Sequence, residues 1–222
     1  DFNVAVGYAA LSADTFGSHS TAIGWSALAA QNFSTATLSY NTAVGFKAGL
    51  SVTSGVQNTL VGGLSGDALT TGARNTTLGY ATLTSDTQGQ YAVAIGYAAL
   101  QNQNFTTATN NYNVAIGYSA GSAVTTGTLN TLLGGLTGDA FTTGTTNTAL
   151  GAQALSADTA GNRSVAVGNA ALFAQNFSTS TNVYNVAVGY EAGAAVSTGT
   201  NNVLIGGLAG DALTVGERNS VL

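Results

Sequence analysis

Aspartates recur in this sequence in a setting that could bind calcium. Asp67, Asp139 and Asp211 each stand in a Gly-Asp-Ala-(Leu/Phe)-Thr motif, and the stretch GGLSGDALT around Asp67 is close to the calcium-binding nonapeptide of parallel β-helices. The motif occurs only at these three widely separated places, so neighbouring coils do not add carboxylate ligands. Aspartate beside glycine is also a common turn former, because its carboxylate accepts hydrogen bonds from nearby backbone amides. We therefore predict turns here, keep these three aspartates as calcium candidates, and expect no cofactor.

The other ionisable residues do not form a catalytic set. His19 is the only histidine, and the corresponding position holds Tyr91 and then Arg163 later in the chain, so its chemistry is dispensable there. No Ser-His-Asp set, metal cluster or phosphate-binding loop can be assembled. A carboxylate pair for glycan hydrolysis is the remaining alternative, since six aspartates recur at fixed positions. A catalytic site in three copies would be unusual, and we predict that the chain is not an enzyme.

Three longer segments, 29–39, 101–111 and 173–183, share the sequence QNF and are followed by a tyrosine. Each adds four residues to the local spacing, and an insertion tolerated at one place per coil is typical of a surface loop. We therefore expect these insert loops to protrude from one side of the molecule. Their phenylalanines could contact glycans or pack against another copy, and their asparagines form glycosylation sequons. The candidate glycan contacts are Phe33, Phe105 and Phe177, and the candidate glycosylation sites are Asn32, Asn104 and Asn176.

A row of glycines with fixed spacing indicates which elements position these residues. The intervals between the twelve glycines follow the order 17-21-17-17 and then recur in that order, which gives three 72-residue repeats, 3–74, 75–146 and 147–218. Such a short period predicts a solenoid in which each coil stacks on its neighbour. We predict one continuous repeat region over 1–222, a fragment of a longer fibre. The repeat glycines are Gly7, Gly24, Gly45, Gly62, Gly79, Gly96, Gly117, Gly134, Gly151, Gly168, Gly189 and Gly206.

Each repeat glycine follows a short segment that is apolar on both faces. The residue directly before the glycine is always Val, Ile or Leu, and the residue three before the glycine is Val or Thr. The residue between these two is Ala or Leu in eleven cases, as in Thr42-Ala43-Val44 before Gly45. Because strand side chains alternate, the first two share one face and the third occupies the other. We predict that the Val/Thr and aliphatic face forms the core, and that the Ala/Leu face meets two other copies around a threefold axis. Exposure of Thr21, Thr42 and Thr59 in a flat row would instead favour ice binding.

Asparagine lies four residues before most repeat glycines, and stacked asparagines stabilise parallel strands by passing amide hydrogen bonds from rung to rung. The second coil of each repeat breaks this row with Ser20, Ala92 and Ser164. Together these patterns predict an all-β parallel β-solenoid (β-roll) of about twelve coils, each with two short strands and two turns. The asparagines of the row are Asn3, Asn41, Asn58, Asn75, Asn113, Asn130, Asn147, Asn185 and Asn202.

Composition excludes several classes of partner. Charged residues make up 6% of the chain and its net charge is −5, whereas a nucleic-acid-binding surface is basic. The longest apolar run, YAVAIGYAAL at 91–100, is about half of the roughly 20 residues that a membrane helix needs. Cysteine is absent, so there is neither a disulfide nor a thiolate metal site. We expect no nucleic-acid partner and no membrane insertion in this segment.

The recurring run N-(T/V)-A-(V/I)-G-x-x-A appears in NTAVGFKAG at 41–49 and in NVAIGYSAG at 113–121. It resembles the repeats of trimeric autotransporter adhesin heads, the YadA-like β-roll, and is similar to NTAxGxxAL repeats of bacteriophage tail fibres. The resemblance covers essentially the whole chain and implies an extracellular homotrimer on a bacterial surface or a virion. We therefore expect a structural shaft or head segment of a trimeric fibre that presents an adhesive or receptor-binding tip. The alternative is a β-solenoid adhesin that binds cell-surface glycans directly through its insert loops.

Overall fold

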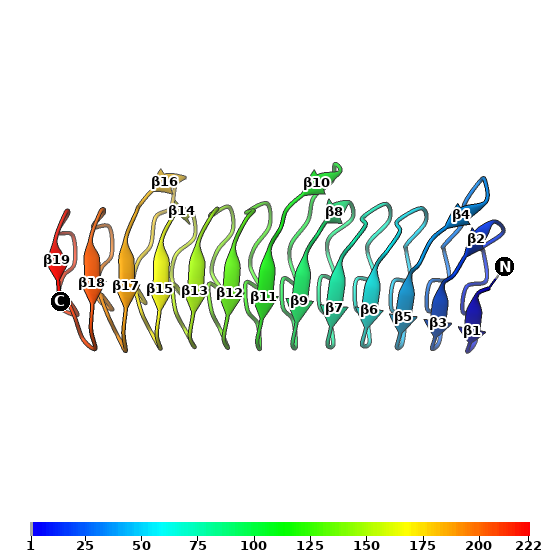
Figure 1. Cartoon of the computed structure of the whole chain (residues 1–222), viewed down its shortest axis with the longest axis horizontal. Helices are drawn as coiled ribbons and strands as arrows, with labels where there is room; N and C mark the ends of the chain where they lie inside the picture. The colour runs from blue at the N-terminus through cyan, green and yellow to red at the C-terminus, as the bar shows by residue number, and fades with distance from the viewer. Residues whose placement is uncertain (1) are drawn as a thin grey trace. The chain divides into compact units, whose positions relative to one another are not determined.

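A computed structural model describes residues 2–222, so Asp1, the first residue of the expected repeat region, lies outside the description. The chain divides into two compact units, an N-terminal unit over residues 1–112 and a C-terminal unit over residues 113–222. Each is a parallel β-solenoid built from short strands, turns and bends, which confirms the predicted all-β class (Figure 1). Between Phe2 and Leu222 there is no helix that is long and apolar enough to cross a membrane.

The N-terminal unit stacks six wall strands side by side in a parallel sheet, in the order β1-β3-β5-β6-β7-β9 (Figure 1). Equivalent positions of successive coils pair directly, as in Thr42↔Thr59 and Ala43↔Leu60. This register confirms that the glycine spacing marks one coil. The wall strands are β1 (Val4–Val6), β3 (Thr21–Ile23), β5 (Thr42–Val44), β6 (Thr59–Val61), β7 (Thr76–Leu78) and β9 (Val93–Ile95).

The C-terminal unit repeats the arrangement with seven wall strands in the order β11-β12-β13-β15-β17-β18-β19. Its register is the same, with Thr131↔Thr148 and Leu132↔Ala149 as one example. The wall strands are β11 (Val114–Ile116), β12 (Thr131–Leu133), β13 (Thr148–Leu150), β15 (Val165–Val167), β17 (Val186–Val188), β18 (Val203–Ile205) and β19 (Ser220–Val221).

Most coils contain one strand, not the two that we predicted. Within residues 2–222, a second strand forms only where the first coil of a repeat meets the insert loop of the next coil, as a parallel pair of two-residue strands. Elsewhere, the part of each coil outside the wall strand consists of turns and bends. Its backbone forms individual hydrogen bonds to the neighbouring coil and no regular strand ladder. The pairs are β2 (Gly17–Ser18) with β4 (Thr37–Leu38), β8 (Gly89–Gln90) with β10 (Thr109–Asn110), and β14 (Gly161–Asn162) with β16 (Thr181–Asn182).

The repeat glycines are required for two reasons at once. Gly62 has a φ of +132°, a conformation that is costly for residues with a Cβ atom. A Cβ atom at Gly62 would also lie 2.2 Å from the carbonyl oxygen of Gly79 in the next coil, which is closer than any allowed contact. The chain therefore turns at each repeat glycine where successive coils approach most closely.

The core is formed by the face opposite to the one that we predicted. Ala43 and Leu60 are 0% exposed within their own chain, whereas Thr59 and Leu78 are exposed on the outside. The asparagine row explains the inversion. Asn58 is also fully buried, and it lies two residues before Leu60, so the two side chains share one face of the strand. Burying the asparagine ladder therefore turns the Ala/Leu positions inward and leaves the Val/Thr and aliphatic positions outside.

The predicted asparagine ladder is present, with a modified pattern of hydrogen bonds. The Nδ2 of Asn58 donates to the carbonyl oxygen of Gly72 at 2.9 Å, and its Oδ1 accepts from the backbone N–H of Asn75 at 3.0 Å. Asn75 repeats both bonds with Gly89 and Ala92. Each asparagine thus ties its own coil across the core and links it to the backbone of the next coil, not mainly to the next side chain.

Candidate interaction surface

The outer wall is the exposed face of the wall strands, made by the first and third residue of each three-residue strand. Its outward residues are Val or Thr in the first position and Val, Ile or Leu in the third. Leu78 is 50% exposed and Ile205 is 42% exposed, so the wall leaves large aliphatic side chains in solvent. Contiguous exposed apolar surface of this kind marks an interaction site or an aggregation liability. The Ala/Leu face is packed inside its own chain and is therefore not available to a second copy, contrary to our prediction.

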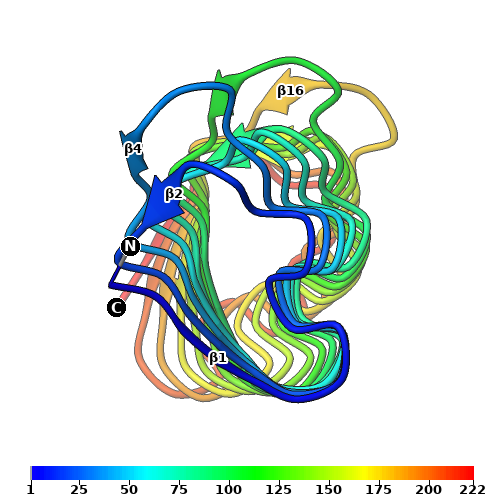
Figure 2. The same cartoon turned by 90° about the vertical axis from the view of Figure 1, so that its right-hand side faces the viewer.

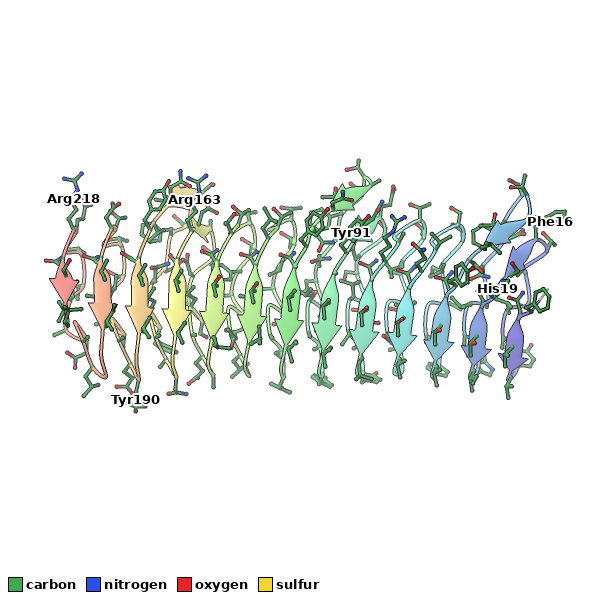
Figure 3. All side chains as sticks on the ribbon, viewed as in Figure 1. Phe16, His19, Tyr91, Arg163, Tyr190 and Arg218 are labelled. Carbon is green, nitrogen blue, oxygen red and sulfur yellow. The ribbon has the colours of Figure 1, made fainter. Side chains whose placement is uncertain are left out.

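Two rows of positions, most of them with large side chains, flank the outer wall. The leading border holds the residue before each asparagine position, and the trailing border holds the residue after each repeat glycine. In the C-terminal unit, Arg163 lies at one end of the strands and Tyr190 lies at the opposite end (Figure 3). The leading border is Phe2, His19, Tyr40, Gln57, Arg74, Tyr91, Tyr112, Leu129, Thr146, Arg163, Tyr184, Asn201 and Arg218. The trailing border is Tyr8, Trp25, Phe46, Gly63, Tyr80, Tyr97, Tyr118, Gly135, Ala152, Asn169, Tyr190 and Gly207.

All nine tyrosines and the single tryptophan of the chain belong to these two borders. Along the trailing border, Trp25 stacks on Tyr8 at 5.9 Å and on Phe46 at 5.2 Å between ring centroids. Along the leading border, Tyr91 stacks on Tyr112 at 5.1 Å. Tyrosine and tryptophan combine a large apolar body with a polar tip, which suits surfaces that become buried in an interface. The outer wall therefore has an aliphatic centre and amphipathic aromatic edges.

All three arginines of the chain lie on the leading border, and two of them cover tyrosine rings there. The guanidinium of Arg74 lies 5.4 Å from the ring centroid of Tyr91. Arg163 donates a hydrogen bond to the hydroxyl of Tyr184 at 2.6 Å and lies 5.5 Å from its ring centroid. On the trailing border, a hydrogen bond to the neighbouring Glu191 carboxylate raises the pKa of the Tyr190 phenol. The leading border is thus the more cationic edge.

Exposed threonines on the outer wall meet one requirement of the ice-binding hypothesis. Thr59 and Thr76 are exposed next to each other, and Thr131 and Thr148 form a similar pair in the C-terminal unit. However, Val93 and Val165 occupy the same row, and the adjoining row mixes Val, Ile and Leu side chains of different height. The aromatic borders add still taller groups on both sides. The wall is therefore not the uniform flat threonine array that ice binding requires.

The insert loops stand out from the coils of each unit, as predicted (Figure 2). Their short strands β4, β10 and β16 also continue the pairing of the preceding coil, so the extra residues are partly absorbed into the solenoid. The candidate sequon residues Asn32, Asn104 and Asn176 are exposed. The candidate glycan contacts are not: Phe33, Phe105 and Phe177 are only 7%, 7% and 9% exposed. The rings pack beneath the loops, and the prediction that they are exposed aromatics is wrong.

A buried polar pair anchors each insert loop, and the sequence reasoning missed it. In the second repeat, Oδ1 of Asp86 accepts hydrogen bonds from the backbone N–H groups of Gly89 and Phe105, both at 3.0 Å. Its Oδ2 accepts from Nε2 of Gln103 at 2.6 Å. Burial raises the pKa of Asp86, and these hydrogen bonds oppose the shift. The signal in the sequence was the recurrence of an aspartate in one coil and a glutamine at the equivalent position of the next coil.

The calcium candidates lie in turns, as predicted. Asp139 accepts a hydrogen bond from Ser156 at 2.6 Å, while Oδ1 of Asp67 is buried without a hydrogen-bond partner. Burial is the main cause that raises the pKa of Asp67. Within residues 2–222, no group of three or more His, Asp or Glu side chains could hold a metal ion. Acidic side chains alone therefore form no cluster within these residues, and calcium binding by these aspartates stays a prediction.

A hollow of about 290 Å³ lies beside the first insert loop. Its lining includes the exposed rings of Phe2, Phe16 and His19 together with Leu38 of β4. The corresponding residues differ in the other repeats, where Gln88 and then Ala160 replace Phe16. The hollow is therefore a feature of the first repeat's own sequence.

Comparison with known proteins identifies no relative: no protein-family model, curated protein or solved structure matches the chain.

Proposed function

We propose that this chain is a structural segment of an extracellular fibre in which three copies associate through their outer walls. The single observation that carries the proposal is the outer wall itself, an exposed aliphatic sheet face bordered by aromatic rows. The location outside the cell, on a bacterial surface or a virion, rests on the resemblance of the repeat motif to adhesin heads and tail fibres. In this role the segment holds a binding tip at a distance.

The size of the outer wall supports association between copies. In each unit, about six strands spaced by about 4.8 Å and about six residues rising about 3.3 Å each give a face of roughly 600 Å². Stable protein interfaces bury about 800 Å² on each partner, and the walls of the two units together, roughly 1,200 Å², exceed that size. The chain carries few charges that would keep such a face soluble, since only 6% of its residues are charged. A second copy with the same wall is the partner whose surface matches it along its length.

The mass of the protein in solution tests this proposal directly. We expect a trimer for the wild type and a monomer for Leu78→Glu, which places a charge in the centre of the wall. The matched control is Thr71→Glu, an exposed position off the wall that should remain trimeric. Ala43→Glu should instead fail to fold, because Ala43 is fully buried in its own core. A monomeric wild type, or a trimer that tolerates Leu78→Glu, would contradict the proposal.

The hollow beside the first insert loop favours a second function, direct binding of glycans. Its exposed aromatic rings and nearby hydroxyl groups, including Thr15 and Ser18, offer both apolar and hydrogen-bonding contact to a sugar. Binding of labelled glycans should then be lost in Phe16→Ala and retained in Gln88→Ala, the corresponding change in the second repeat. Equal binding by both variants would rule out this hollow as the site.

A further inference from the structure

The two borders of the outer wall vary together along the sequence. A leading-border residue and the trailing-border residue of the same coil lie six positions apart, as Tyr91 and Tyr97 do. Wherever the trailing residue is aromatic, the leading residue is aromatic, His or Arg. Wherever the trailing residue is Gly, Ala or Asn, the leading residue is not aromatic. The aromatic coils pair Phe2 with Tyr8, His19 with Trp25, Tyr40 with Phe46, Arg74 with Tyr80, Tyr91 with Tyr97, Tyr112 with Tyr118, and Tyr184 with Tyr190.

Common descent of the three repeats does not account for this pattern. The coil of Gly151 has Thr146 with Ala152, where the equivalent coil of Gly79, one repeat earlier, has Arg74 with Tyr80. The next coil has Arg163 with Asn169 in place of an aromatic pair, so leading and trailing residues change together twice. The coil after that keeps both members as tyrosines. The two positions of a coil therefore respond to a shared constraint.

Contact within one chain does not provide that constraint. Six residues of extended chain separate the two borders by about 20 Å, given a rise of about 3.3 Å per residue. Figure 3 places Arg163 and Tyr190 at opposite ends of the strands. The ring contacts run along a border, as in Tyr8 with Trp25 or His19 with Tyr40, and not from one border to the other. Contact with another copy would supply the shared constraint.

The height of the paired residues indicates how the copies are arranged. Six residues are about a third of a 17-residue coil, so the two members of a pair differ in height along the coil stack by less than about 2 Å, taking about 4.8 Å per coil. Copies related by rotation about an axis parallel to the stack keep every residue at its own height. An antiparallel arrangement would instead bring coils of different height together. Only parallel, level copies place residues of the same coil opposite each other.

We infer that the leading border of one copy packs against the trailing border of the next, coil for coil, around an axis parallel to the coil stack. This inference rests on the proposed association through outer walls and specifies its polarity and register. Aromatic and cationic residues of one border meet aromatic rings of the other, which are favourable partners for both. Opposite Gly63 on the trailing border, the partner on the leading border of the next copy is the long side chain of Gln57. Small residues there leave room for that side chain.

Chemical cross-linking tests the register, because the chain has no cysteine of its own. The double variant Tyr91→Cys/Tyr97→Cys should be joined between copies by a short bismaleimide, whose reach exceeds that of a direct disulfide. A bismaleimide is preferable to oxidation, since a disulfide requires Cα atoms within about 7 Å of each other. We expect a covalent trimer as the largest product. Tyr97 is exposed and Tyr91 is half-buried at the wall edge, so the mass before cross-linking verifies that each variant assembles.

Three controls separate the outcomes. Tyr91→Cys alone and Tyr97→Cys alone should give no cross-linked product, because like borders do not meet. His19→Cys/Tyr97→Cys is staggered by four coils, about 19 Å, and should give at least tenfold less product. Cross-linking of either single variant, or equal yield from the staggered variant, overturns the level pairing. A monomeric wild type overturns the proposed association itself, and a product that stops at a covalent dimer contradicts the trimer while leaving the pairing intact.

Discussion

The asparagine ladder makes a large and testable contribution to stability. Asn58 is fully buried and serves two backbone groups that have no other partner within the ladder. Its Nδ2 donates to the carbonyl oxygen of Gly72, and its Oδ1 accepts from the N–H group of Asn75. In Asn58→Ala both backbone groups stay in place, because neighbouring coils still hold them, but each loses its hydrogen bond. The substitution therefore leaves two buried polar groups unsatisfied.

The expected loss in the free energy of unfolding follows from these two groups. A buried donor or acceptor left without a partner costs about 1–3 kcal/mol, so two of them cost roughly 2–6 kcal/mol. A domain has about 5–15 kcal/mol in total, which makes this a large fraction. Thr71→Ala is the matched control: its side chain is exposed off the outer wall, and a change there should stay within about 0.5 kcal/mol.

Urea unfolding followed by circular dichroism measures this loss, at equal protein concentration because association shifts apparent stability. Hydrogen exchange of the Asn75 amide supplies a local readout, since that amide loses its acceptor in the variant. We expect a clear drop in the unfolding midpoint and loss of protection at Asn75. If the free energies of unfolding of Asn58→Ala and Thr71→Ala agree to within the small spread typical of surface substitutions, the reasoning is refuted.

Three further predictions concern the turns, the buried carboxyls and the outer wall. Gly134→Ala should destabilise the C-terminal unit by about 1–3 kcal/mol, because its φ is +137° and a Cβ atom would lie 2.7 Å from the carbonyl group of Gly151. A Cβ atom at the neighbouring Gly135 would meet open space, so Gly135→Ala should be close to neutral. Thermal melts of the two variants measure the difference. Burial raises the pKa of Asp158 above the ordinary value of 3.8. The stability that the protonated carboxyl contributes is therefore fully present below pH 3.8 and is lost as the pH rises through the folded-state pKa. In unfolding midpoints measured from acid to neutral pH, Asp158→Asn should show a smaller decline than the wild type. The mixed side-chain heights of the outer wall predict no thermal hysteresis in ice-growth assays, and measurable hysteresis abolished by Thr59→Leu would contradict that interpretation.

The architecture could be predicted from the sequence because one geometric requirement recurs in every coil. A glycine that must adopt positive φ and admit the next coil at close range cannot be replaced, so its spacing records the coil length. The choice of buried face was harder, since Thr59, Leu60 and Val61 are all compatible with a core. The invariant aliphatic residue before each repeat glycine suggested Val61, but the burial of Asn58 decided for Leu60, which shares its face. The asparagine row held the answer and was not combined with the alternation of the strand.

The burial of the loop phenylalanines had a different cause. Phe105 looked exposed because it lies in an insertion with polar neighbours. Its backbone N–H group, however, donates to Asp86 of the preceding coil, which draws the start of the loop against the coil and covers the ring. That contact joins residues 19 positions apart in different coils. Such a contact follows from the three-dimensional stacking and is not apparent from composition around the loop.

The same polar pair accounts for a repeat of four coils where one coil would suffice to propagate a solenoid. One position cycles through Asp, Gln, Val and Leu or Phe in successive coils, and in the second repeat all four residues are fully buried: Asp86, Gln103, Val124 and Phe141. The aspartate anchors the insert loop from below, and the glutamine of the insert coil donates to it; in the first repeat, Nε2 of Gln31 lies 2.9 Å from Oδ2 of Asp14. The Oε1 of Gln31 accepts from Nδ2 of Asn41 at 2.8 Å, so the glutamine takes up the space that an asparagine of its own coil would need. The asparagine position of the insert coil therefore holds a small residue, serine or alanine, as at Ser20. The break in the asparagine row results from accommodating the insert loop. The following apolar coils restore an uninterrupted core before the next insertion, which sets the 72-residue period.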